Sequence, residues 1–331
     1  MAAMPFPGRC LLLGLLFAIP VLRAAETPSP ALLVVNKEDA TLAIVDPASR
    51  QVVARIPVGQ GPHEVVTSAD GKLAIVSNYG ERAAGKTLSV IDLRSQKELR
   101  RVQLSPLQHP HGLYFADGKV YFTAEDNMII GRYDPASDEV EWMLGTGQRI
   151  THMIQLSRDR NTIFTANIGS NSVSIIAKIP FGRGWDPTVV PVGKGPEGFD
   201  LSPDGKQLWV AHSQDGGISI IDLASKRVVQ SFDIHTKRSN RLRFTTDGGR
   251  VLVSDLEGGE LVVIDAGTRS VLKRIAAGKA PEGILIEPGG SRAYVAVSGD
   301  NQVAVLNVLT WEVTDRFSTG MGPDGMAWAV R

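Results

Sequence analysis

Three histidines and a glutamate recur at one place in a repeated segment of this sequence. In "HPHGLYFADGK" (residues 109–119), His111 stands just before an alternating apolar run, and His63 and His152 stand before similar runs. Glu197 takes the same place in a fourth copy, "GPEGFDLSPDGK". Neutral imidazole and carboxylate are ligands for zinc, copper, iron and manganese. We therefore predict a divalent transition-metal site held by His63, His111, His152 and Glu197.

The segment recurs seven times, and its period indicates the fold. A full copy has an apolar strand, a turn that is often Asp-Gly, a second strand and two more strands, without sustained helical periodicity. Four short strands repeated every 41–48 residues are typical of propeller blades. The residues at the common place are His63, His111, His152, Glu197, Asn240, Glu282 and Asp324.

The two ends of the chain carry complementary parts of one blade. Residues 31–59 contain three strands without a first one, and residues 322–331 contain a single first strand. Pairing these ends would complete a seventh blade and leave no open sheet edge. We predict an all-β, seven-bladed β-propeller over residues 25–331, with four-stranded antiparallel blades closed by the C-terminal strand.

The common place is the joint where the chain passes from an outermost strand to the next innermost strand. Its seven residues, here called the joint ring, should surround one mouth of the central channel. We expect this ring to be solvated, with coordination positions open to water or substrate. Across it from the histidines, Glu282 and Asp324 are candidates for a catalytic base or a substrate contact. The alternative is a polar channel lining that holds no metal.

A second ring follows the second strand of each blade, eight residues after the turn aspartate. Its members are Asn36, Asn78, Glu125, Asn167, His212, Asp255 and Val297. The asparagines suit hydrogen bonding to loop backbone, whereas Glu125, His212 and Asp255 are candidates for ligand contact or general acid–base catalysis. A polar insertion at residues 78–87 lies on the same face and is a candidate lid.

The N-terminus has the layout of an export signal. Arg9 precedes an apolar run that ends at Leu22, and small residues follow, so residues 1–24 read as a signal peptide. The alternative is an uncleaved anchor. Cleavage would remove Cys10, the only cysteine, and the product would have no membrane span. We expect a periplasmic or secreted protein, and a monomer. With 35 basic and 35 acidic residues, nothing favours nucleic-acid binding.

Three copies share a common pattern: "IFTANIGSNSVSII" (residues 163–176), "LWVAHSQDGGISIIDLASKRVV" (208–229) and "AYVAVSGDNQVAVLN" (293–307). These segments resemble the YVTN-type β-propeller repeat family, which comprises secreted seven-bladed proteins of bacteria and archaea. The resemblance covers residues 31–331 and implies the same fold. It implies less about function, because relatives include binding proteins, surface proteins and cofactor-bearing enzymes.

Three functions follow as expectations. The first is a propeller that binds a small-molecule or protein ligand at the channel mouth. The second is a metal-dependent lyase or hydrolase that uses the His/His/His/Glu site. The third, implied by the family's redox relatives, is a propeller with a non-covalent redox cofactor over the mouth. "GKGPEG" (residues 193–198) matches a dinucleotide-binding motif, but it opens no helix, so the match is incidental.

Overall fold

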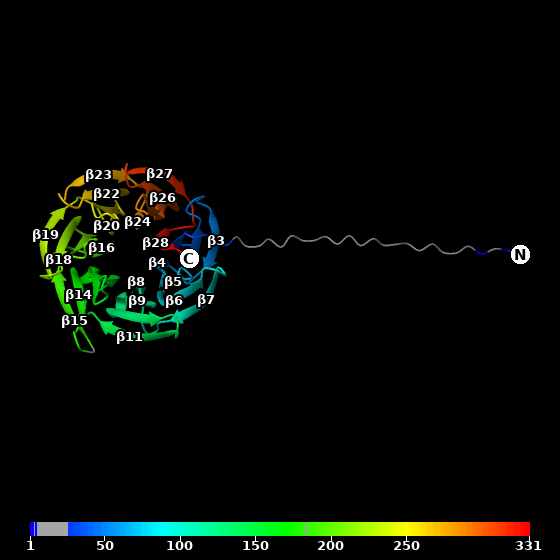
Figure 1. Ribbon diagram of the computed structural model, residues 1–331, viewed down its shortest axis with the longest axis horizontal. Coiled ribbons are helices and arrows are strands. Elements are labelled where there is room, and N and C mark those ends of the chain that lie inside the picture. The colour runs from blue at the N-terminus through cyan, green and yellow to red at the C-terminus, as the bar shows by residue number, and fades with distance from the viewer. Residues whose placement is uncertain (3, 5–25, 183) are drawn as a thin grey trace.

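The computed structural model describes residues 1, 2, 4, 26–182 and 184–331. The strands between Ala31 and Ala329 form the predicted ring of seven four-stranded sheets (Figure 1). The predicted signal peptide, residues 1–24, lies outside the described residues except at positions 1, 2 and 4. Within the described part of the chain, no helix is long and apolar enough to cross a membrane.

In each blade the strands run antiparallel, and in order, from the channel to the rim. The blade built from both ends of the chain contains β28 (Pro323–Ala329), β1 (Ala31–Asn36), β2 (Thr41–Val45) and β3 (Val52–Pro57). The next two contain β4 (Pro62–Thr67), β5 (Leu73–Gly80), β6 (Ala84–Asp92) and β7 (Lys97–Gln103), then β8 (Pro110–Ala116), β9 (Lys119–Ala124), β10 (Ile129–Asp134) and β11 (Glu139–Gly145).

The remaining four blades repeat this arrangement. They contain β12 (Thr151–Leu156), β13 (Thr162–Asn167), β14 (Ser172–Lys178) and β15 (Trp185–Pro191); β16 (Pro196–Leu201), β17 (Gln207–His212), β18 (Gly217–Asp222) and β19 (Arg227–Asp233); β20 (Ser239–Phe244), β21 (Arg250–Asp255), β22 (Glu260–Asp265) and β23 (Val271–Ala276); and β24 (Pro281–Ile286), β25 (Arg292–Val297), β26 (Gln302–Asn307) and β27 (Glu312–Phe317). Short 3₁₀ turns follow three of the second strands, at Glu125–Asn127, Ile168–Ser170 and Ser298–Asp300.

The ring closes as predicted, because β28 pairs with β1 and places Trp328 opposite Leu32. All six residues of β1 are buried, since neighbouring blades cover both faces of the inner strands. The outermost strand β19 instead alternates exposed and half-buried residues. The apolar core therefore lies in the interfaces between blades, as the strand patterns predict.

Glycines set the spacing of the innermost strands just below the joint ring. The position after the joint residue is glycine in four blades, and a Cβ there would meet the neighbouring strand. A Cβ added at Gly112 would lie 2.5 Å from His152 O, and one at Gly198 would lie 2.6 Å from Arg241 Cα. A Cβ added at Gly283 would lie 2.2 Å from Asp324 O, and one at Gly325 would lie 2.3 Å from His63 O. These strands therefore approach more closely than any side chain allows.

Deleting residues 322–331 should destabilise the whole ring. The deletion removes β28, which exposes the edge of β1 and the apolar residues that β28 covers. We expect a protein that aggregates and loses its cooperative unfolding transition, as measured by size-exclusion chromatography and urea denaturation. A truncated chain that stays monomeric and unfolds cooperatively would contradict closure through β28.

Candidate functional site

The joint ring lines a pocket of about 750 Å³ at one mouth of the channel. We expected a solvated ring, but six of its seven residues are buried, and His111 is only 3% exposed. His63 alone is half-buried. The ring is drier than predicted because the closely spaced strands bring neighbouring joint residues into contact. The second predicted ring contributes Glu125 to the same pocket.

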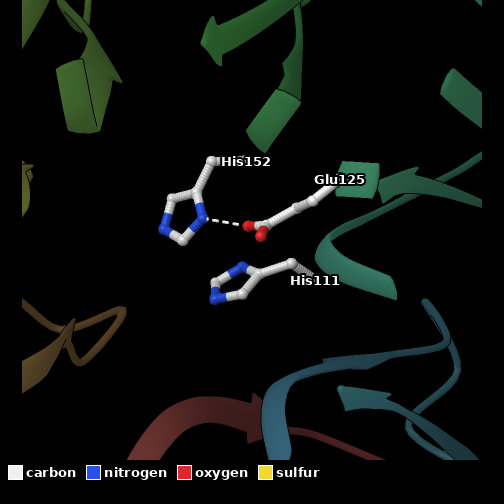
Figure 2. Close-up of side chains that lie close together, drawn as sticks. All are labelled: His111, Glu125 and His152. Carbon is white, nitrogen blue, oxygen red and sulfur yellow. Dashed lines mark hydrogen bonds and ion pairs between the residues drawn. The ribbon is translucent and has the colours of Figure 1, made fainter. Parts of the chain in front are cut away.

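His111, His152 and Glu125 form the densest cluster in the pocket (Figure 2). One possible ligand atom from each residue lies within 4.8 Å of the others, and all three side chains are buried. His152 Nδ1 donates a hydrogen bond to Glu125 Oε1 at 2.5 Å. The rings of His111 and His152 stack with their centroids 3.8 Å apart. Consecutive blades thus place two imidazoles and a carboxylate around one small space.

Two imidazole nitrogens in this cluster lack hydrogen-bond partners. Both His111 Nδ1 and His152 Nε2 are buried without a partner in the described structure. Burial, with His152 and His63 nearby, holds the pKa of His111 well below 6.5, so the ring is neutral at pH 7. Burial raises the pKa of Glu125, but the attraction of His152 outweighs it and the net pKa is lowered. The cluster therefore offers the neutral imidazole of His111 beside the carboxylate of Glu125.

Tyr79 fixes the other oxygen of this carboxylate. Its hydroxyl donates to Glu125 Oε2 at 2.8 Å, and its ring lies 4.6 Å from that of His63. Burial and the charge of Glu125 raise the pKa of Tyr79, so it stays protonated. The segment that we expected to be a lid is instead an extension of β5 and β6, paired at Gly80 and Ala84. The contact of Tyr79 with Glu125 was not predicted from the sequence.

The fourth predicted ligand, Glu197, lies on the other side of His152. Its Oε1 is 4.0 Å from His152 Nε2 and accepts a hydrogen bond from Asn240 Nδ2 at 2.7 Å. His63, the remaining predicted ligand, has its ring centroid 5.0 Å from that of His111. The structure therefore brings the four predicted ligands to one pocket, with Glu125 closer to His111 and His152 than the sequence suggested.

Lys37 joins the two acids across the ring. It comes from the turn between β1 and β2, and its Nζ lies 2.5 Å from Glu282 Oε2 and 3.6 Å from Asp324 Oδ2. Burial and the charge of Asp324 raise the pKa of Glu282 to about 7. Burial acts the same way on Asp324, but Lys37 and Arg241 outweigh it and lower its pKa. Sequence reasoning named both acids and missed the lysine.

An ion pair crosses the channel directly below the joint ring, and its arginine lines the pocket. At the position after the joint residue, where four blades have glycine, β4 carries Glu64 and β20 carries Arg241. Arg241 Nη2 lies 2.5 Å from Glu64 Oε1, with the two side chains 4% and 12% exposed. Because β28 and β24 separate these strands around the ring, the pair spans the channel.

Two other candidates, His212 and Asp255, do not line the pocket. His212 Nδ1 lies 2.9 Å from Asp215 Oδ1. Asp255 accepts hydrogen bonds from the backbone amides of Lys237, Arg238 and Gly258. Asp255 therefore fixes a joint loop, as the asparagines of its ring were expected to do.

The fold and the site define the class: a seven-bladed β-propeller with a titratable pocket at one channel mouth. In sequence, the chain is 26% identical over 171 residues to the uncharacterized protein YncE of Salmonella typhimurium, which covers 50% of this chain and 48% of that protein. The chain thus spans about half the length of the curated relatives it matches. No family model matches it.

Solved structures share the fold at low identity. The periplasmic gluconolactonase PpgL of Pseudomonas aeruginosa has a TM-score of 0.73 and 17% identity, over 91% of this chain and 99% of that one. Hydrazine synthase of Kuenenia stuttgartiensis has a TM-score of 0.74 and 17% identity, over 89% and 99%. The chain is therefore similar in fold to lactonase-like propellers and related in sequence to YncE.

Breaking the Glu64–Arg241 pair from one side should be costly. Glu64→Leu would leave a buried guanidinium without its carboxylate, and we expect a loss of about 3–5 kcal/mol in the free energy of unfolding. Adding Arg241→Met should recover much of that loss, because no buried charge then remains. Urea denaturation of wild type, both single variants and the double variant measures the coupling. Additive effects would contradict a direct pair.

Proposed function

We propose that this protein binds a divalent transition metal at the channel mouth through His111, His152 and Glu125, and that the ion helps to hold a small polar ligand in the pocket. The observation that carries this proposal is the cluster of three possible ligand atoms, one each from His111, His152 and Glu125, within 4.8 Å of one another. His111 Nδ1 is buried without a hydrogen-bond partner in the described structure. Buried polar atoms are usually hydrogen-bonded, so this nitrogen favours a cation.

The charges around the pocket favour a cation as well. Five carboxyl groups but only three cationic side chains line it, namely Glu125, Glu197, Glu257, Glu282 and Asp324 against Lys37, Arg238 and Arg241. Arg241 is already paired with Glu64. An ion at the cluster would replace the proton that His152 shares with Glu125. His63 and Glu197 flank this position, and the four-ligand set predicted from sequence remains a prediction.

Neighbouring side chains would hold the metal-binding carboxylates in position through hydrogen bonds. Tyr79 holds Glu125 from the side away from His152, which fixes the carboxylate against both histidines. Asn240 holds Glu197 in the same way on the far side. A metal of this kind supplies Lewis acidity and lowers the pKa of bound water.

Glu282 favours a second candidate function, metal-dependent hydrolysis or elimination. This carboxyl group lies in the same pocket with a pKa of about 7. A general acid or base works best with a pKa near the operating pH. The name of the fold relative PpgL, a periplasmic gluconolactonase, suggests a lactone as the first substrate class to test.

Family, location and assembly are also proposals. We infer a YVTN-type repeat protein from the strand patterns, exported on its predicted signal to the periplasm or beyond. It would act as a monomer on a small-molecule or protein ligand, without nucleic acid. The redox-cofactor alternative remains a prediction from the resemblance.

Metal binding should depend on His111. Metal-stripped wild type titrated with zinc is expected to bind about one equivalent, and His111→Ala should bind it at least about 100-fold more weakly because a direct ligand is lost. His235→Ala is the matched control, since that histidine is 79% exposed and faces Asp233. Calorimetry measures the zinc affinity, and elemental analysis measures the amount of bound metal. Less than about a tenth of an equivalent of zinc, copper, iron or manganese in wild type would reject the proposal.

If the protein is a lactonase, its rate of hydrolysis should follow the ionisation of Glu282. If the Glu282 carboxylate is the general base, metal-dependent hydrolysis of a δ-lactone should rise with pH through about 7, because the ionised form is the active one. Glu282→Gln should remove this rise and lower kcat by about 10²–10⁴-fold while zinc still binds. Initial rates corrected for spontaneous hydrolysis provide the test. Unchanged kinetics in the variant would exclude Glu282, and no metal-dependent hydrolysis would exclude this lactone.

A further inference from the structure

A second cavity lies below the Glu64–Arg241 pair. This lower cavity has a volume of about 430 Å³ and is lined by residues of all seven innermost strands. Glu64 forms part of its wall, and its carboxylate is held by Arg241 from the histidine side. The ion pair thus separates the lower cavity from the pocket at the other mouth. Its volume is within the range of about 300–1,000 Å³ that is usual for small-molecule sites.

The lower cavity has a mixed lining. Its apolar residues include Val66, Leu285, Met326 and Trp328, whereas Leu113, Ile154 and Phe199 are buried in the interfaces between blades. Tyr114, Gln155 and Thr67 are among the few uncharged polar residues there. Apolar walls with a few convergent polar groups are typical of small-molecule binding sites, because the walls supply affinity and the polar groups fix the orientation.

Arg243 is the one cation among the residues that line this cavity. Its Nη1 donates to the carbonyl oxygens of Leu242 and Phe199, at 3.2 and 3.3 Å. Within the described part of the chain, its Nε and Nη2 form no hydrogen bond, and no carboxylate oxygen lies within 4.0 Å of the guanidinium. A half-buried guanidinium with two free nitrogens is suited to a carboxylate, which it can grip with two parallel hydrogen bonds.

Asp200, an acid in the lining of the lower cavity, already has hydrogen-bond partners. Asp200 accepts hydrogen bonds from the amides of Leu201 and Phe244, both at 3.0 Å, and from the Gln155 side chain at 3.3 Å. These bonds join β12, β16 and β20, so Asp200 has a structural role between innermost strands. Glu64 is likewise committed to Arg241. Burial raises the pKa of Asp200, and the nearby charge of Arg243 opposes this. Both carboxylates in the lower cavity therefore have hydrogen-bond partners, whereas Arg243 lies near Asp200 and keeps unused donors.

We propose that the lower cavity binds a small organic monocarboxylate, with Arg243 holding the carboxylate and the aromatic and aliphatic walls covering an apolar body. This site shares no lining residue with the pocket at the histidine mouth, and it does not depend on a metal. A carboxylate rather than a phosphate fits best, because Arg243 is the one cation in the lining and Asp200 lies near it, so the cavity suits a single negative charge at most.

Benzoate is a suitable probe, with benzyl alcohol as its uncharged counterpart. In metal-stripped full-length protein, calorimetry and saturation-transfer NMR should show saturable benzoate binding with a Kd at or below about 1 mM. Benzyl alcohol should bind at least about 10-fold more weakly, because the charged hydrogen bonds are lost. Arg243→Gln should weaken benzoate binding by about 10-fold or more. The benzoate affinity of Arg243→Lys should lie between those of wild type and Arg243→Gln.

Arg250→Gln is the matched control, because it removes one positive charge whose partner is Asp265, outside the cavity lining. It should leave benzoate binding unchanged, and zinc should leave it unchanged in wild type. Equal binding of benzoate and benzyl alcohol, no saturable binding, or the same Kd in well-folded Arg243→Gln would overturn the proposal. The comparison of the two probes on wild type keeps it testable if Arg243→Gln fails to fold. Failure here would leave the metal proposal standing.

Discussion

Close packing of the innermost strands around one axis determines what the rest of the molecule can do. Four glycines below the joint ring let neighbouring strands come nearer than any Cβ permits. That approach brings joint residues of consecutive blades into direct contact, so His111 and His152 stack even though 41 positions separate them in the chain. It also buries most of the joint ring, and burial shifts the pKa values of its ionisable side chains.

The pocket divides into two halves of different electrostatic character. On one side, His111 and His152 lie beside Glu125, which Tyr79 and His152 fix from opposite oxygens. On the other, Lys37 lies between Glu282 and Asp324. Burial and the charge of Asp324 raise the pKa of Glu282, whereas Lys37 and Arg241 lower that of Asp324. One half thus groups candidate metal ligands, and the other holds two carboxyl groups with different pKa values.

The repeat made the fold and the ring predictable, whereas side-chain direction and burial were not. A period of 41–48 residues gives blades, and the register places His63, His111, His152 and Glu197 at one mouth. The second ring put Glu125 on that face, but only the structure shows its carboxylate between Tyr79 and His152. Tyr79 and Lys37 lie outside both registers, so no spacing marks them. The Glu64–Arg241 contact joins residues 177 apart, which sequence order cannot reveal.

The ion pair across the axis has a consequence for how substitutions can act on the two cavities. The Glu64–Arg241 contact lies one residue below the histidines, with Arg241 in the lining of the pocket at the histidine mouth and Glu64 in that of the lower cavity. The two cavities share no lining residue. A substitution in one lining can therefore change that cavity without altering the residues of the other, except where it disturbs this pair.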